Sequence, residues 1–333
     1  MRFLVQWLIS RAQQIGAERS IEDLARYLQA VSIEVAATLA IDGFEVERNL
    51  KIGDYELVSW NDVPMTDTKW HFASRQLFSG DTPTAALIQR HKIQRAHVRP
   101  WDVPGPNDPL SIEPTLDVLR CMTAVAGAGF RLLHYWFEPP EWAPWAVSRS
   151  TFGVDSTSLP MPVALSEAVV PLLIESASRL RELDESSRMR LRVPLDRLNR
   201  SYLAGMRNVD KAIELGIALE SLYAPAKMSE GIAFAVRTRA ARFLGGSPHE
   251  RHSLVTTLRD VYDLRSRAVH SGRFDADGTK KWRDDVRVRQ VLGEGQRVVG
   301  RSLVKAVREG EPNWEDFDIG IAKPTSAIAD VER

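Results

Sequence analysis

A change of hydrophobic period near residue 162 constrains the fold of this 333-residue chain more than any other feature. From residue 166 to residue 309, apolar side chains recur almost throughout at the spacing of an amphipathic helix. Four short breaks interrupt this pattern, at residues 184–187, 223–225, 245–248 and 271–278. They predict about five helices joined by short loops, which is the pattern of a compact antiparallel bundle.

The preceding part of the chain carries strand signals as well. Residues 1–40 have apolar side chains at helical spacing, which predicts one or two helices before Gly43. These side chains include Leu24, Leu28, Val31 and Val35. Residues 44–47 and 55–60, on either side of residues 51–54, alternate apolar with polar side chains. This pattern is typical of a β-hairpin with one face exposed to solvent.

Six prolines follow between residues 64 and 109, and they disfavour long regular elements because each one removes a backbone N–H donor. They are Pro64, Pro83, Pro100, Pro104, Pro106 and Pro109. Beyond them we expect a helix from Pro114 to about Ala124, with proline in its first turn, and an aromatic strand at residues 130–137. The stretch 142–162 is rich in Trp, Ser, Gly and Pro, so we expect the domain linker at its end.

These patterns predict an α+β protein. A small mixed α/β N-terminal domain, residues 1–162, precedes an all-α bundle, residues 163–310. Residues 311–333 are acidic and lack periodicity, so we expect a flexible tail apart from a docking of Trp314 and Phe317.

Composition narrows the class of protein. One cysteine, Cys121, argues against a disulfide framework or a thiolate metal cluster, and no segment approaches the ~18 apolar residues of a membrane span. We therefore expect a cytoplasmic protein without a membrane partner. The net charge is zero, but residues 175–309 hold 27 Lys plus Arg against 18 Asp plus Glu, and residues 1–174 hold 15 against 20. The basic half favours a polyanionic partner, although a solvated arginine-rich surface gives the same count.

Two charged residues fall on apolar helix faces. Glu220 continues the stripe that begins at Ile213, and Arg239 continues the stripe that begins at Ile232. Burying either charge alone would cost several kcal/mol, so one expectation is that the two meet as a hydrogen-bonded pair. The alternative is that each lies at the edge of its stripe and reaches solvent.

A second arginine lies on an inward helix face shortly before a histidine. Arg265 follows Leu258 and Val261 on that face, and Gly272 predicts a helix stop that places His270 in the final turn. At ~100° per residue, five positions turn the helix by ~140°, so the two side chains do not project side by side. The arginine would have to curl toward the imidazole, or a second copy would have to supply it.

Histidine and arginine together suit metal-free RNA cleavage. Imidazole titrates near neutrality and can take the proton of a 2′-hydroxyl, and guanidinium offers a permanently charged fork that matches two phosphate oxygens. Their spacing alone favours a simpler interpretation, in which His270 caps the end of its helix.

The segment Leu258-Arg-Asp-Val-Tyr-Asp-Leu-Arg-Ser-Arg-Ala-Val-His-Ser-Gly272 resembles the signature of the HEPN superfamily, an arginine, usually a polar residue, and then a histidine four to six positions on. The likeness is greatest to the Apea-like branch and covers about residues 200–273. In that branch an Asp/Glu-Arg stretch similar to Glu250-Arg251 precedes the signature. N-terminal strands with Trp-containing, Pro-ended turns, here at residues 58–64 and 98–104, are similar as well.

This resemblance implies a helical bundle that forms a homodimer around two copies of the signature, without cofactor or metal. Active members are metal-independent endoribonucleases, often toxins or antiviral defence effectors, so RNA is the implied partner. His270 would be the acid/base group and Arg265 the phosphate clamp. The supporting residues would be Ser266, Arg267, Glu220 and Arg239.

Two other classes of function remain. Some members of the superfamily keep the bundle and bind RNA, a nucleotide or a protein without cleaving anything. A metal-dependent hydrolase would need clustered ligands, and His249 with His252 lacks an accompanying carboxylate motif. The N-terminal aromatic strands could hold a ligand or a regulatory partner, although packing is the simpler role for them.

Overall fold

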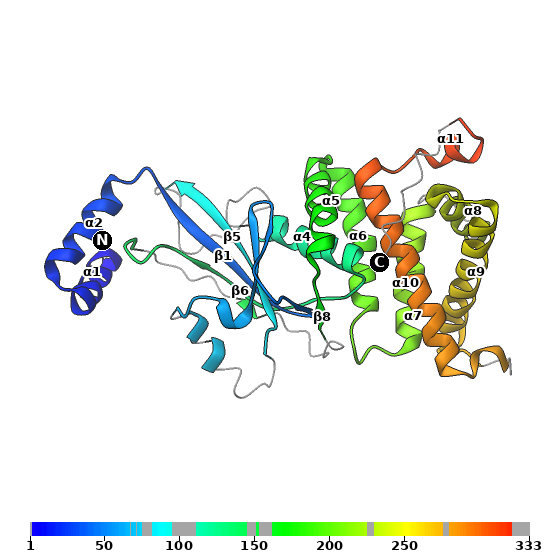
Figure 1. The fold of residues 1–333 in the computed structure, drawn as a ribbon, viewed down its shortest axis with the longest axis horizontal. Helices are drawn as coiled ribbons and strands as arrows, with labels where there is room; N and C mark the ends of the chain where they lie inside the picture. The colour runs from blue at the N-terminus through cyan, green and yellow to red at the C-terminus, as the bar shows by residue number, and fades with distance from the viewer. Residues whose placement is uncertain are drawn as a thin grey trace. The chain divides into compact units, whose positions relative to one another are not determined.

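A computed structural model describes residues 2–66, 68–70, 72–74, 82–94, 111–144, 151–152, 162–224, 230–275 and 280–321. The chain divides into two compact units. Unit 1 comprises Met1–Thr115 with Arg131–Asp155, and unit 2 comprises Leu116–Phe130 with Ser156–Arg333. The fold is α+β, as predicted, because an antiparallel sheet with helices precedes a largely helical region (Figure 1).

Unit 1 begins with two helices, α1 (Arg2–Ile15) and α2 (Ala17–Gln29), and then turns into the long strand β1 (Ser32–Asp42). The prediction of helix up to residue 40 is therefore wrong beyond Gln29. Ala30 adopts extended backbone angles and ends α2. Val31 is 84% exposed, whereas Val35 is fully buried, so the apolar spacing that we interpreted as helical continues from a helix into a strand.

Unit 1 is built on a six-stranded sheet in the order β3-β4-β5-β1-β6-β7. Its further strands are β3 (Leu50–Ile52), β4 (Tyr55–Ser59), β5 (Ala85–Gln94), β6 (Arg131–Glu138) and β7 (Thr151–Phe152). Each pairing is antiparallel, and β1 runs between β5 and β6 (Figure 1). A hairpin is present, but it is formed by β3 and β4 rather than by residues 44–47 and 55–60, and the predicted strand at 130–137 corresponds to β6.

Two strand predictions need correction. The short strand β2 (Phe44–Glu45) is not the hairpin partner of β4, because β3 takes that place. The ten-residue strand β5 lies where the prolines argued against long elements. Pro83 precedes β5 rather than interrupting it, so no ladder donor is lost.

The first Trp-Pro turn packs against the sheet. Trp60 opens the short 3-10 helix η1 (Trp60–Asp62) and lies edge-on to Trp136, at 6.3 Å between ring centroids. The buried Lys69 donates from Nζ to the carbonyls of Trp60, at 2.9 Å, and Val63, at 2.6 Å. Residues 98–104, the second such turn, lie outside the described residues.

Among the described residues between 166 and 309 there are six α-helices, one more than predicted. They are α5 (Val170–Glu182), α6 (Glu185–Ser201), α7 (Asn208–Tyr223), α8 (Ile232–Leu244), α9 (Pro248–Ser271) and α10 (Asp285–Glu309). The additional break separates α6 from α7, where Gly205 adopts φ 77°. The helix α10 packs against α5, α6, α7, α8 and α9 and forms the centre of the bundle. Two further helices flank this range, α4 (Glu113–Ala126), which belongs to unit 2 from Leu116 onward, and α11 (Trp314–Asp318).

Three further short elements are β8 (Val163–Ala164) and the 3-10 helices η3 (Glu167–Val169) and η4 (Lys280–Trp282). The helix predicted from Pro114 is α4. In the part of the chain that the structure describes, no helix combines the length with the apolar character that a membrane crossing requires.

The predicted docking of Trp314 and Phe317 is confirmed. Phe317 is 1% exposed, and the Trp314 ring lies 5.7 Å from that of Phe243 and 5.3 Å from that of Tyr223. The helix α11 therefore packs on the bundle through its aromatic side chains.

Candidate active site on helices α7 and α9

Helix α9 carries the arginine and histidine of the predicted site, and its sequence explains both of its ends. Ser247 caps the first turn in a capping box with Glu250, and Pro248 occupies the first position. Gly272 adopts φ 66° and donates its backbone N–H to Ala268 at 3.0 Å. His270 consequently lies in the last turn, as predicted.

Arg265 lies against helix α7 rather than in open solvent. Its aliphatic stem packs on Gly216, where an added Cβ would come within 2.4 Å of Arg265 Cγ. Its Nη2 lies 3.0 Å from Oε1 and 3.2 Å from Oε2 of Glu220. The glycine thus provides the space that lets the arginine reach the carboxylate.

Tyr262 completes this arrangement one turn before Arg265. Its hydroxyl donates to the same Glu220 carboxylate, and its ring centroid lies 5.6 Å from Arg265 Cζ. Burial raises the pKa of the Tyr262 hydroxyl, and the hydrogen bond to anionic Glu220 raises it further. Tyr262 therefore remains a protonated donor that orients the carboxylate.

The ion pair of Arg265 with Glu220 lies at the surface of the bundle, since each side chain is 26% exposed. The Nε of Arg265 is buried without a hydrogen-bond partner among the described residues. The ion pair with Glu220 fixes the guanidinium of Arg265 in position. The same carboxylate largely neutralises its charge, so a bound anion would have to compete with Glu220 for the guanidinium.

His270 is exposed, and in the described part of the chain its ring has neither a hydrogen-bond nor an ion-pair partner. Five positions along a helix correspond to about 140° and to about 7.5 Å of rise, so Arg265 and His270 project from different faces of α9. Ser266, four positions before the histidine, shares its face and is half-buried. Helical spacing within one copy therefore places His270 on the same face as Ser266 rather than on the face of Arg265.

Arg267 lies elsewhere. Its Nε donates to Asp263 at 3.1 Å and its Nη1 to the carbonyl of Phe274 at 3.2 Å. These bonds hold the residues that follow α9 against the helix, so Arg267 stabilises the end of the helix that carries the site.

The predicted pair of Glu220 and Arg239 is wrong. Arg239 is 3% exposed and pairs with Asp318, at 2.6 Å, and with the carbonyl of Tyr223, at 2.6 Å. Both charges on the apolar faces are indeed compensated, but Arg239 finds its acid in helix α11 and Glu220 finds its base in Arg265.

Two residues of this arrangement escaped the prediction. Gly216 is an isolated glycine inside a helix, which often marks a close approach of another element. Tyr262 was given no role in the predicted site, although it lies three positions before Arg265 on the same side of α9.

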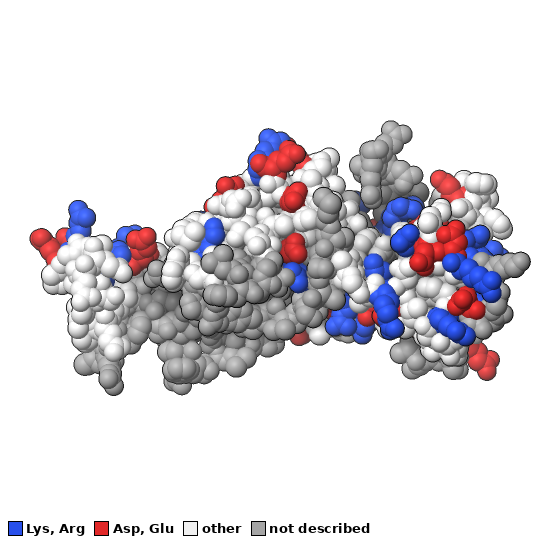
Figure 2. All heavy atoms as spheres, turned by 90° about the horizontal axis from the view of Figure 1, so that it is seen from below, with Lys and Arg blue, Asp and Glu red and all other residues white. Residues whose placement is uncertain are grey.

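The described residues contain no group of three His, Cys, Asp or Glu side chains placed to hold a metal ion. Lys and Arg are interspersed with Asp and Glu on the face of unit 2 seen in Figure 2, so cationic side chains do not form a single unbroken patch on that face. Comparison of the chain with protein-family models, with curated proteins and with solved structures found no match.

Proposed function

We propose that unit 2 is a metal-independent endoribonuclease of the HEPN type, in which His270 is the acid/base group and Arg265 binds the scissile phosphate. One observation carries the proposal: an arginine held rigidly at the bundle surface lies in the same helix as an exposed imidazole that has no partner in the described chain. A fixed cation and a solvent-accessible base are the two groups that metal-free phosphodiester cleavage needs.

The reaction that these groups suit is an internal transfer on RNA. Neutral His270 takes the proton of a 2′-hydroxyl, whose oxygen attacks the adjacent phosphorus, and the bond to the 5′-oxygen breaks. The leaving oxygen takes a proton from an imidazolium, so the products are a 2′,3′-cyclic phosphate and a 5′-hydroxyl. Arg265 stabilises the charge that accumulates on the phosphate oxygens.

In this proposal, a second copy of the chain provides one of the two residues that bind each phosphate. Arg265 and His270 project about 140° apart on α9, so one phosphate reaches both only if they come from two copies. Val269, which neighbours Arg265 on the helix surface, is an apolar side chain with 50% exposure, and a symmetric partner would cover it. The proposed assembly is a homodimer through the helical unit.

The resemblance to HEPN proteins also suggests the biological setting. Such an enzyme would act as a toxin or as an antiviral defence effector in the cytoplasm, and unit 1 would regulate it. Ser266 would contact the RNA beside His270, and Glu220 would keep Arg265 in position.

The main alternative is a non-catalytic module that binds RNA, a nucleotide or a protein partner. It is favoured by the Glu220 carboxylate, which occupies the guanidinium that a phosphate would need. It is favoured also by the interspersed charge on the face of unit 2 in Figure 2.

One experiment separates the two. The purified protein and its His270→Ala variant are incubated with total RNA and with tRNA in EDTA. The control is the variant His249→Ala, which removes another exposed histidine, at the opposite end of α9. The nuclease predicts cyclic-phosphate products that only His270→Ala abolishes. RNA binding without cleavage, or cleavage that survives His270→Ala, rejects it.

A further inference from the structure

Helices α1 and α2 form a hairpin that buries almost none of its own side chains. They are 14 and 13 residues long and lie side by side, with Gly16 between them at φ 92° (Figure 1). Among the described side chains of the hairpin, residues 4–29, only Ser20 is buried. Helices this short are marginal in water by themselves, because most helical stability in proteins comes from packing of an apolar face. The hairpin therefore needs a further surface to pack on.

Four large apolar side chains of the hairpin are exposed instead. Val5 and Ile9, four positions apart on α1, are 51% and 56% exposed. Ile21 and Leu28, seven positions apart on α2, are 59% and 53% exposed. Spacings of four and seven place each pair on one stripe of its helix. A single exposed apolar residue is ordinary, whereas a continuous apolar patch marks an interaction site.

The two stripes lie on the same side of the hairpin. The half-buried Leu8 and Ile15 mark the side of α1 that faces α2, and the buried Ser20 with the half-buried Leu24 marks the side of α2 that faces α1. At ~100° per residue, each exposed stripe lies roughly 60–110° round its helix from that side, in the same rotational sense. Because the helices run antiparallel, equal rotations lead to the same side. The four exposed side chains therefore form one surface, which we call the hairpin patch.

Charged side chains of the hairpin contact the rest of unit 1. The Cζ atom of Arg26 lies 4.2 Å from the ring centroid of Trp142, in the segment after β6. Arg11 lies 2.9 Å from Asp23 and 3.7 Å from Glu141. The hairpin thus turns charged groups toward its own unit and the hairpin patch toward solvent, which is the reverse of the usual orientation of an amphipathic helix.

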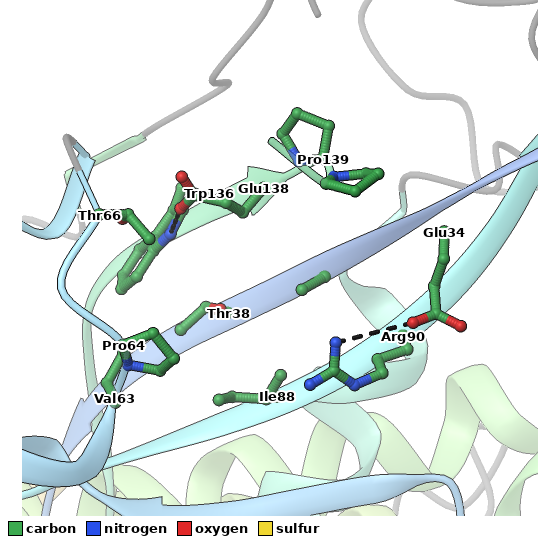
Figure 3. Close-up of a pocket in the computed structure, with 12 residues that line it drawn as sticks. Glu34, Thr38, Val63, Pro64, Thr66, Ile88, Arg90, Trp136, Glu138 and Pro139 are labelled. Atoms are coloured by element: carbon green, nitrogen blue, oxygen red, sulfur yellow. Dashed lines mark hydrogen bonds and ion pairs between the residues drawn. The ribbon is translucent and has the colours of Figure 1, made fainter. Parts of the chain in front are cut away.

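The sheet of the same unit shows the usual arrangement. Glu34 of β1 and Arg90 of β5 pair at 3.7 Å, and both side chains are exposed (Figure 3). Ile33 and Ile93, which pair in register between the same two strands, are buried. The hairpin patch departs from this arrangement, which points to a partner that covers it.

The charge pattern of the hairpin favours a second copy as this partner. About a twofold axis a surface meets an identical surface, so any charge near the axis faces a like charge. The exposed side chains of α1 between residues 4 and 15 are all uncharged, so an α1 that meets itself brings no like charges together. A membrane surface fits less well, because helices that lie on membranes are rich in Lys and Arg. Residues 4–29 instead balance three arginines, Arg11, Arg19 and Arg26, against three acids, Glu18, Glu22 and Asp23.

We propose that the hairpin patch packs against the same patch of a second copy, so that two hairpins form a four-helix bundle. Each copy contributes Val5, Ile9, Ile21 and Leu28 to its core. The contact is separate from the one proposed at α9, and it does not depend on the ribonuclease function, because all of its residues belong to unit 1.

The test is sedimentation equilibrium on the full-length protein carrying Val269→Glu, which removes the proposed contact at α9. At tens of micromolar we expect a dimer of two 37.4 kDa chains. Adding Ile9→Glu should raise its dissociation constant at least about tenfold, because two like charges enter an apolar interface. Gln14→Glu, at an exposed position about 140° round α1 from Ile9, should leave the dissociation constant unchanged.

Cross-linking provides a second measurement that does not rely on loss of binding. Ile9→Cys should be joined to a second chain by a short bifunctional maleimide, whereas Gln14→Cys should not, and the native Cys121 is buried. The proposal is overturned if the Val269→Glu protein is a monomer, if Ile9→Glu and Gln14→Glu dimerise alike, or if the two cysteine variants cross-link equally. Binding of a monomeric protein to anionic phospholipid vesicles, lost in Ile9→Glu, would overturn it as well and assign the hairpin patch to a membrane.

Discussion

Arg265 and Gly216 are in direct contact across the interface of α9 and α7, since a Cβ on Gly216 would lie 2.4 Å from Arg265 Cγ. The atom that would be met is near the backbone of the arginine rather than at its flexible end. An alanine here must therefore rotate the whole side chain and move its guanidinium away from Glu220.

Gly216→Ala is predicted to destabilise the protein by about 1–3 kcal/mol through overpacking. Gly293→Ala in α10 is the matched control, because an added Cβ there meets no described atom within 4 Å, and it should instead stabilise by about 0.5–1 kcal/mol. Calorimetric unfolding checks both. Equal effects of the two substitutions would contradict the contact.

Tyr262 is predicted to make the stability of the bundle sensitive to alkaline pH. Its pKa is raised above the ordinary 10.0 by burial and by Glu220. Once the pH passes 10.0, the unfolded chain therefore loses this proton while the folded chain keeps it, and the free energy of unfolding falls. The stabilisation is complete below that pH.

Tyr262→Phe tests this linkage. At neutral pH the variant loses one hydrogen bond to a carboxylate, worth about 1.5–3 kcal/mol. Above pH 10.0 the stability gap to the parent protein should narrow, as followed by urea unfolding of the two proteins. The buried Tyr223, whose pKa is also raised, is present in both and cancels. A gap that stays constant would argue against the linkage.

Asp117 is predicted to be a main anchor of α4 on α6. It is 2% exposed and accepts from Arg120 at 2.8 Å and from Arg192 at 2.6 Å. Asp117→Ala should cost about 3–5 kcal/mol, because it leaves two guanidinium groups partly buried without this carboxylate. Asp196→Ala removes a half-exposed partner of Arg120, at 2.7 Å, and should cost at most about 1 kcal/mol. The denaturant midpoints of the two variants, each compared with that of the parent protein, test whether Asp117→Ala has the larger effect.

Local sequence signals predicted the elements that carry the candidate site. Periodicity located α9, and Gly272 located its end, because a glycine stop is a local property of the chain. The same reasoning failed at β1, where apolar spacing crossed from a helix into a strand. It also missed the break at Gly205, a lone signal inside an otherwise helical pattern.

The partners of the charged residues could not be predicted from the sequence. Arg239 pairs with Asp318, 79 positions away, and that acid lies in a segment without any period. Glu220 was correctly recognised as a charge on an apolar face, but its base is Arg265, 45 positions on. Choosing among several arginines requires the packing of helices, which local spacing does not encode.

The arrangement of Arg265 and His270 leads to a last prediction, which concerns the proposed dimer. If one phosphate is bound between Arg265 of one copy and His270 of the other, Arg265→Ala and His270→Ala are each inactive alone. A mixed dimer of the two then contains one site with both residues intact and one with neither.

An equal mixture that exchanges subunits freely should recover about a quarter of the parental activity per chain, since half of the dimers are mixed and each holds one of two sites. Activity is read as cyclic-phosphate ends on tRNA in EDTA. Val269→Glu, added to both chains, should prevent pairing through the apolar part of α9 and so abolish recovery. A mixture as inactive as its parts, although sedimentation shows mixed dimers, would place both residues of the working site in one copy.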